Sequence, residues 1–178
     1  MLFSTDGKIV KCHRCVVAAS SPVLSDLFSY SSNIESLPEN LRLAVHDSAL
    51  EVLLAFCYTG SLHDIPVDNL CLILKASIAL QMGSAVALIL DLIRSHFQIG
   101  TIMTTLGQAV DMSCGELVAS CLNFVDEKFR NVALEQSFVD APGHIISLIL
   151  ERDTLFLHAE IEVFRGWFIF FRVSKGGV

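Results

Sequence analysis

The sequence has little charge, and less of it is positive than negative. Only 17% of its 178 residues are charged, with 12 Lys plus Arg against 19 Asp plus Glu, which gives a net charge of -7. The basic residues are scattered singly, so no positive stripe is present that could bind a phosphate backbone. We therefore do not expect nucleic acid as a partner.

Long hydrophobic runs are also missing, although 53% of the residues are hydrophobic and the mean hydropathy is +0.59. The longest charge-free apolar run covers 15 residues, 76–90, and is interrupted by Ser77, Gln81, Gly83 and Ser84. A membrane-spanning helix needs about 20 apolar residues. The start of the chain has neither the basic nor the long apolar region of a signal peptide. We expect no membrane partner and a cytoplasmic or nuclear protein.

The short motifs of common catalytic sites are absent: the sequence contains no GxSxG, GxxxxGK[ST] or HExxH. A CxxC is present at residues 12–15, but no second ligand pair follows at zinc-site spacing. The apolar surroundings of the cysteines predict raised thiol pKa values and weak nucleophiles. We expect no enzyme, no metal, no cofactor and no disulfide. The six cysteines are Cys12, Cys15, Cys57, Cys71, Cys114 and Cys121.

The first half of the chain mixes strand and helix signals. Alternating or β-rich stretches predict short strands over 2–5 and 8–12, around an Asp6-Gly7 turn, and over 41–45 and 61–65. Ser21-Pro22 predicts the cap and first residue of a helix that continues over 23–30. Further helices are predicted over 48–59, from a Ser48/Glu51 capping box to Gly60, and over 68–82, capped by Asp68, and 83–97.

The helix predicted over 48–59 is apolar on two sides. One side carries Leu50, Leu53, Leu54 and Cys57, and the other carries Ala49, Val52 and Phe56. Because one apolar face is sufficient for a core, the second face is either buried against a later helix or offered to a partner.

No strand pattern recurs from Gly100 onwards. A helix is predicted over 101–112, and a second capping box at Ser113/Glu116 predicts the start of another, whose inner face runs from Leu117 to Phe129. Further helices are predicted over 134–139, 143–150 and 159–170. The sequence therefore predicts an α+β part followed by an all-α part.

The stretch from Cys12 to Pro22 carries the most specific motif. His13-Arg14, Val17, Ala19, Ser21-Pro22 and Phe28 stand in the order and spacing of the BTB (POZ) signature, which this segment resembles. Tyr58-Thr59-Gly60 also closes the helix before it as in BTB domains. The resemblance marks six residues as structural signature positions, and we expect His13 to be buried with its ring bonded to nearby backbone. They are His13, Arg14, Ser21, Pro22, Tyr58 and Gly60.

The run of residues 150–155, with Glu160, 162–164 and Trp167, resembles the BACK segment that follows many BTB domains. The two resemblances imply a BTB/POZ fold, a small sheet covered by helices, over 1–98, a BACK-like helical segment over 99–170 and an unstructured tail over 171–178. BTB domains usually carry a further helix and strand before the hairpin at which this sequence begins. We therefore expect an N-terminally truncated BTB fold in which the usual homodimer element is missing. No kelch repeat is found.

The resemblance implies a protein-interaction function, and two kinds remain open. BTB-BACK proteins are often substrate adaptors of cullin-3 ubiquitin ligases, whereas other BTB proteins self-associate as scaffolds or in transcription without a cullin. Adaptors carry a hydrophobic-x-Glu motif before the third strand, and Leu37-Pro38-Glu39 fits it. We expect a cullin-docking surface made by Leu37 and Glu39 in this loop and by Val52 and Phe56 on the outer face of the following helix.

Overall fold

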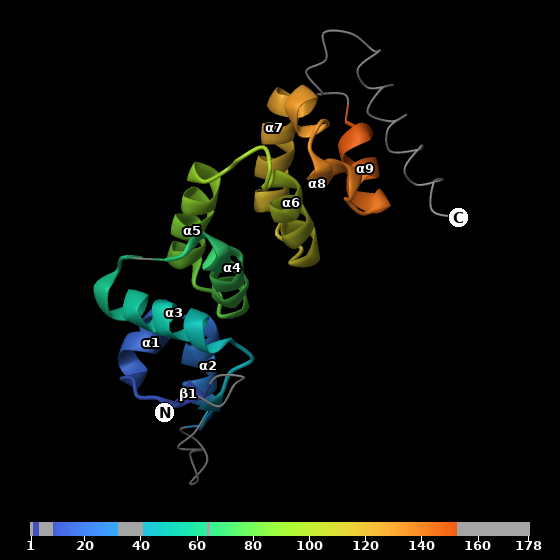
Figure 1. The fold of residues 1–178 in the computed structure, drawn as a ribbon. Coiled ribbons are helices and arrows are strands. Elements are labelled where there is room, and N and C mark those ends of the chain that lie inside the picture. The colour runs from blue at the N-terminus through green and yellow to red at the C-terminus, as the bar shows by residue number, and fades with distance from the viewer. Residues whose placement is uncertain (1, 4–8, 32–40, 64, 153–178) are drawn as a thin grey trace. The chain divides into compact units, whose positions relative to one another are not determined.

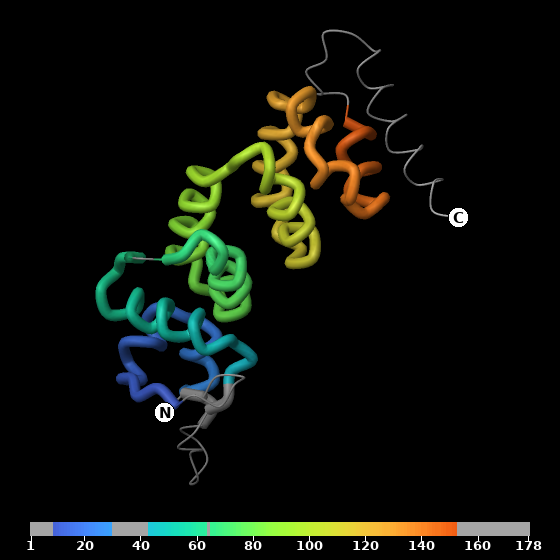
Figure 2. Tube along the Cα trace, viewed as in Figure 1, coloured from blue at the N-terminus to red at the C-terminus, as the bar shows by residue number. Residues whose placement is uncertain are grey.

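The computed structural model of the chain describes residues 2–3, 9–31, 41–63 and 65–152. It divides into two compact units, an N-terminal unit (Met1–Ser95) and a C-terminal unit (His96–Val178), which are described separately. Figure 1 shows the elements of each unit, and Figure 2 follows the chain through them.

The N-terminal unit contains a small sheet of three two-residue strands, β1 (Leu2–Phe3), β2 (Ile9–Val10) and β3 (Leu41–Arg42). Their order is β2-β1-β3, with β1 antiparallel to β2 and parallel to β3. The strands lie where three were predicted but are shorter, and the Asp6-Gly7 turn lies outside the described residues. The strand predicted over 61–65 is wrong, since residues 61–63 and 65 form no strand. Strands this short do not by themselves establish an α+β class.

Helices make up most of the N-terminal unit (Figure 1). The first two helices pack on each other, α3 packs on α1 and α4, and α4 packs on α5. Their bounds are α1 (Arg14–Ser20), α2 (Pro22–Ser31), α3 (Asp47–Thr59), the 3-10 helix η1 (Val67–Asn69), α4 (Leu70–Ala79) and α5 (Gly83–Ser95). The largest fully buried side chains of this core are Leu50, Leu53, Ile73, Leu74, Met82, Ile89 and Leu90.

The predicted cap of α2 is confirmed at Ser21, whose side chain is completely buried. Its Oγ accepts a hydrogen bond from the backbone N–H of Leu24 at 3.2 Å and donates one to the carbonyl oxygen of Leu80 at 2.6 Å. Pro22 is the first residue of the helix. One hydroxyl therefore caps α2 and also holds the end of α4 against it.

The start of α3 differs from the prediction, whereas its end agrees. His46 is the N-cap, and its Nδ1 accepts from the backbone N–H of Ser48 at 3.4 Å and lies 2.9 Å from the Ser48 hydroxyl. The Ser48/Glu51 capping box is wrong because an imidazole two residues upstream takes the cap position. Gly60 ends the helix at φ 69°, the left-handed conformation that glycine adopts without strain.

Asp68 does not cap a helix either. It lies inside η1, and α4 follows with Asn69 as an N-cap that makes no side-chain bond.

The described part of the C-terminal unit consists of helices joined by turns, with no strand. It contains α6 (Ile102–Asp111), α7 (Gly115–Val132), α8 (Gln136–Val139) and α9 (Gly143–Leu150). The capping box at Ser113 is wrong, because Ser113 has a φ of 54° and Cys114 precedes the helix without a side-chain bond. The helix predicted over 159–170 and the tail over 171–178 lie outside the described residues.

Two contacts hold α7 to the elements that follow it. The rings of Phe129 on α7 and Phe138 on α8 meet edge to face, with centroids 6.0 Å apart. Asp126 on α7 pairs with Arg152, just beyond α9, at 2.7 Å. Neither unit has, among its described helices, one with the length and apolar character to cross a membrane.

Candidate functional site

The helix α3 carries the predicted docking face, and the structure divides that face in two. Ala49 is fully buried and Phe56 is only 6% exposed, whereas Val52 is half-buried. The placement of Phe56 on an outer surface is therefore wrong. Residues 49, 53 and 56 lie on one stripe of the helix, next to the stripe of Leu50 and Leu54, so the buried arc is wide. Because α3 packs on both α1 and α4, this whole arc is covered.

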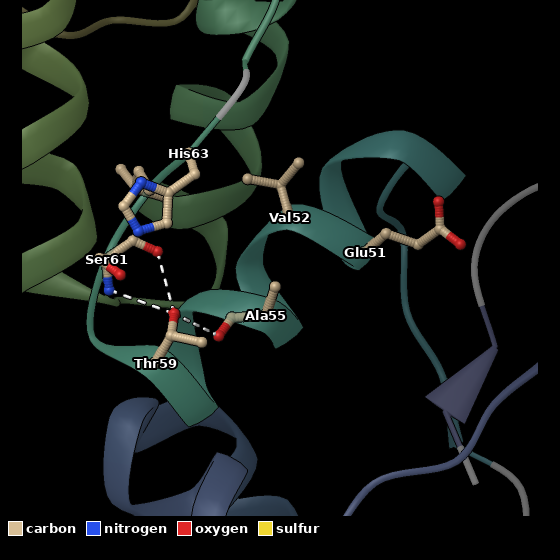
Figure 3. Close-up of a pocket in the computed structure, with 7 residues that line it drawn as sticks. Glu51, Val52, Ala55, Thr59, Ser61 and His63 are labelled. Carbon is tan, nitrogen blue, oxygen red and sulfur yellow. Dashed lines mark hydrogen bonds between the residues drawn. The ribbon is translucent and has the colours of Figure 1, made fainter.

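The remaining outer face of α3 forms one wall of a shallow pocket of about 260 Å³. Figure 3 shows Val52 on the helix and His63 on the segment that follows Gly60. The full lining is Glu51, Val52, Ala55, Thr59, Ser61, Leu62 and His63.

The second wall of this pocket is held in place by Thr59. Its Oγ1 lies 2.9 Å from the carbonyl oxygen of Ala55 and 3.1 Å from that of Ser61, and it accepts from the backbone N–H of Ser61 at 3.3 Å (Figure 3). These bonds turn the chain back along the helix after the left-handed Gly60. Leu62 and His63 are thereby brought to the face that carries Val52.

The size and chemistry of this α3 pocket suit a protein partner. Pockets for small molecules usually measure about 300–1,000 Å³, so a shallow pocket of about 260 Å³ has room for one side chain rather than a whole ligand. Val52, Ala55 and Leu62 supply the apolar surface. The arrangement can bind an apolar side chain that a partner presents.

The other half of the predicted docking surface cannot be placed. Leu37 and Glu39 lie outside the described residues, so the hydrophobic-x-Glu loop stays a prediction.

The signature residues at the start of α1 make contacts to two other helices. The backbone N–H of His13 donates to Tyr58 Oη at 2.8 Å, and His13 Nδ1 lies 2.9 Å from the same oxygen. The expectation of a buried His13 is wrong: the residue is exposed, and its ring is bonded to a phenol instead of backbone. Arg14 places its guanidinium carbon 5.8 Å from the centre of the Phe28 ring on α2.

The cysteines differ in exposure. All six are free thiols, of which Cys121 is buried and Cys15 is exposed. Burial raises the pKa of Cys12 and of Cys57, as their apolar surroundings predicted. Cys15, by contrast, is exposed at the surface of α1. In the described ranges, no three His, Cys, Asp or Glu side chains gather where they could hold a metal ion.

Comparison with known proteins identifies both halves of the chain. The family model of the BTB/POZ domain matches residues 1–97, and the model described as BTB And C-terminal Kelch, BACK, matches residues 102–174. The chain belongs to the BTB-BACK family. Both resemblances predicted from the sequence are thereby confirmed.

Curated relatives of this BTB-BACK chain include kelch-like proteins. It is 24% identical over 169 residues to Kelch-like protein 41 of Rattus norvegicus, covering 94% of this chain and 28% of the relative. It is 23% identical over 169 residues to Kelch-like protein 41 of Homo sapiens, again with 94% and 28% covered. Kelch-like protein 40b of Danio rerio is 22% identical over 153 residues, with 86% and 25% covered. The chain thus spans about a quarter of the length of these relatives.

Most of the pocket lining was missed in the sequence. Val52, Ala55 and Thr59 are spaced at i, i+3 and i+7, a signal of a shared helix face that could have been found. Leu62 and His63 could not have been found in this way, since the sequence predicted a strand for their segment.

Proposed function

We propose that this BTB-BACK chain is a non-enzymatic interaction module that docks on cullin-3 and serves as a substrate adaptor of a cullin-3 ubiquitin ligase. Its membership of the BTB-BACK family and its kelch-like relatives support the adaptor class. The observation that carries the docking site is the open pocket beside Val52, to which Val52, Ala55 and Leu62 contribute apolar surface.

In this proposal the pocket on α3 receives an apolar side chain of cullin-3, and the loop with Leu37 and Glu39 adds a second contact. Phe56 supports the site from beneath by packing in the core, because its side chain is buried. The functional domains are residues 1–98, which dock, and 99–170, which connect the docking domain to a substrate-binding module. We place the protein in the cytoplasm or the nucleus.

The test compares two substitutions in the full chain. Val52→Asp puts a charge into the pocket and should weaken binding to the purified N-terminal region of cullin-3 at least tenfold, since an interface anchor is typically worth about 2 kcal/mol or more. Val67→Asp is the matched control, because Val67 is 52% exposed and lies outside the pocket. Binding is measured by isothermal titration calorimetry, with circular dichroism to check the fold.

Equal binding by both variants would contradict the proposed site. If the unsubstituted chain does not bind cullin-3 and instead self-associates in sedimentation velocity, the alternative of a BTB scaffold or transcription-related protein replaces the adaptor.

A further inference from the structure

The hydroxyl of Thr59 joins the last turn of α3 to the segment that follows Gly60. Its Oγ1 accepts from the backbone N–H of Ser61 at 3.3 Å and lies within donor distance of two carbonyl oxygens (Figure 3). These are the carbonyl oxygens of Ala55, at 2.9 Å, and of Ser61, at 3.1 Å. A hydroxyl has one proton and two lone pairs, so it can donate to one carbonyl at a time while it accepts from the amide.

Donation to Ala55, the nearer carbonyl, makes a chain of two hydrogen bonds. The chain runs from the Ser61 N–H through the Thr59 hydroxyl to the backbone of α3, and each bond polarises the other. Since α3 itself packs on α1 and α4, Ser61 is tied to a rigid part of the unit. The next two residues, Leu62 and His63, line the α3 pocket. The hydroxyl therefore determines where this wall of the pocket lies.

These bonds should contribute little to the stability of the fold. Thr59 is exposed, Ser61 is half-buried, and the bonds between them lie at the surface. Water can replace a partner that an exposed polar group loses, so removing the hydroxyl buries no unpaired group. The end of α3 has its own bond, from the Gly60 N–H to the Phe56 carbonyl oxygen at 2.8 Å. What the hydroxyl adds is order in the segment after the helix.

We propose that Thr59 is a positioning residue for docking at the α3 pocket, because its hydroxyl holds residues 61–63 ready for a partner side chain. This inference rests on the proposed docking of cullin-3. A wall that is ordered before binding loses less conformational entropy when the partner arrives, which raises affinity. Thr59 acts through Leu62 and His63, the residues that meet the partner.

The first test measures amide hydrogen exchange of residues 61–63 by NMR in the free full chain. Thr59→Val keeps the shape of the side chain without the hydroxyl, and the Ser61 amide should exchange about fivefold faster, as expected for the loss of one hydrogen bond. Thr59→Ser retains the hydroxyl and should restore the slow exchange. Thr105→Val is the matched control. Thr105 Oγ1 also bonds the carbonyl oxygen four residues earlier, that of Thr101 at 3.2 Å, but within α6 of the C-terminal unit.

The second test measures the affinity of the same variants for the N-terminal region of cullin-3 by isothermal titration calorimetry. Thr59→Val should weaken binding about fivefold, because the partner must then order the segment itself. Thr59→Ser and Thr105→Val should stay within about twofold of the unsubstituted chain, since each retains the bonds of Ser61 to the hydroxyl of residue 59. The melting temperature of Thr59→Val should equal that of the unsubstituted chain.

The two tests together separate the possible failures. Faster exchange with unchanged affinity, or weaker binding with unchanged exchange, would overturn the positioning role and leave docking at α3 in place. A lower melting temperature for Thr59→Val, or equal effects of Thr59→Val and Thr59→Ser, would overturn it as well. If no variant and not even the unsubstituted chain binds cullin-3, the proposed function fails, and the role of Thr59 in it fails too.

Discussion

Arg152 holds Asp126 with two of its nitrogens. Nε lies 3.0 Å and Nη2 lies 2.7 Å from Asp126 Oδ2, and Nη2 also donates to Asn123 Oδ1 at 3.2 Å. The Asp126 side chain is 9% exposed and that of Arg152 is 26% exposed. The bonds to Asp126 raise the pKa of the guanidinium. This pair fixes the chain after α9 to the middle of α7.

Breaking the pair from one side should destabilise the C-terminal unit. Arg152→Gln leaves the Asp126 carboxylate buried without the guanidinium of Arg152. We expect the free energy of unfolding to fall by about 2 to 3 kcal/mol, somewhat less than for a fully buried pair because Arg152 is partly exposed. Urea denaturation followed by circular dichroism measures the loss. The control is the double variant Asp126→Asn/Arg152→Gln, which should recover part of that stability. The single variant Asp126→Asn is measured as well. If the double variant lost as much free energy of unfolding as the two single variants lose together, the two side chains would not interact.

The hydroxyl of Ser21 should contribute more stability than that of Ser48. Ser21→Ala removes the cap of α2 and leaves the buried Leu80 carbonyl without its bond, so we expect a cost of about 2 kcal/mol. Ser48→Ala keeps the backbone bond to His46 Nδ1 and should cost at most about 0.5 kcal/mol. Denaturation midpoints of the two variants give the comparison. An equal cost for both would restore Ser48 as the cap of α3.

Stability should fall in alkaline solution through the two half-buried thiols. The pKa values of Cys12 and Cys57 are raised by burial above their ordinary value of 9.0, so the folded chain retains protons that the unfolded chain releases. Their contribution is complete below about pH 9 and is lost as the pH rises through the raised values. Urea midpoints between pH 7 and 10, under reducing conditions, should decline less steeply for Cys12→Ser/Cys57→Ser. An unchanged decline would contradict the role of these thiols.

Local signals predicted local features well. Ser21-Pro22 and Gly60 act within one helical turn, and both are found as expected. The predicted cap of α3 is wrong for an equally local reason, because the S-x-x-E pattern does not include the imidazole of His46, which is a competing acceptor. Short strands were harder to predict. The alternation over 61–65 predicts a strand, but hydrogen bonds to Thr59 hold the start of this segment against α3.

Features that depend on distant residues could not be predicted. Whether Phe56 is covered depends on how α1 and α4 pack around α3, which the periodicity of one helix does not contain. The contact of His13 with Tyr58 joins residues 45 positions apart, and Asp126 and Arg152 are 26 positions apart. The α3 pocket combines a helix face that is visible in the sequence with a following segment that is not.

The most direct measurement of cullin docking is hydrogen–deuterium exchange of the full chain with and without the N-terminal region of cullin-3. If cullin-3 docks as proposed, exchange slows in residues 51–63, which contain the outer face of α3 and the segment with Leu62 and His63, and around Leu37 and Glu39. Residues 14–29 of α1 and α2, none of which lines the α3 pocket, should exchange as before. Slowed exchange confined to residues outside 37–63, or no change at saturating cullin-3, would contradict docking at α3.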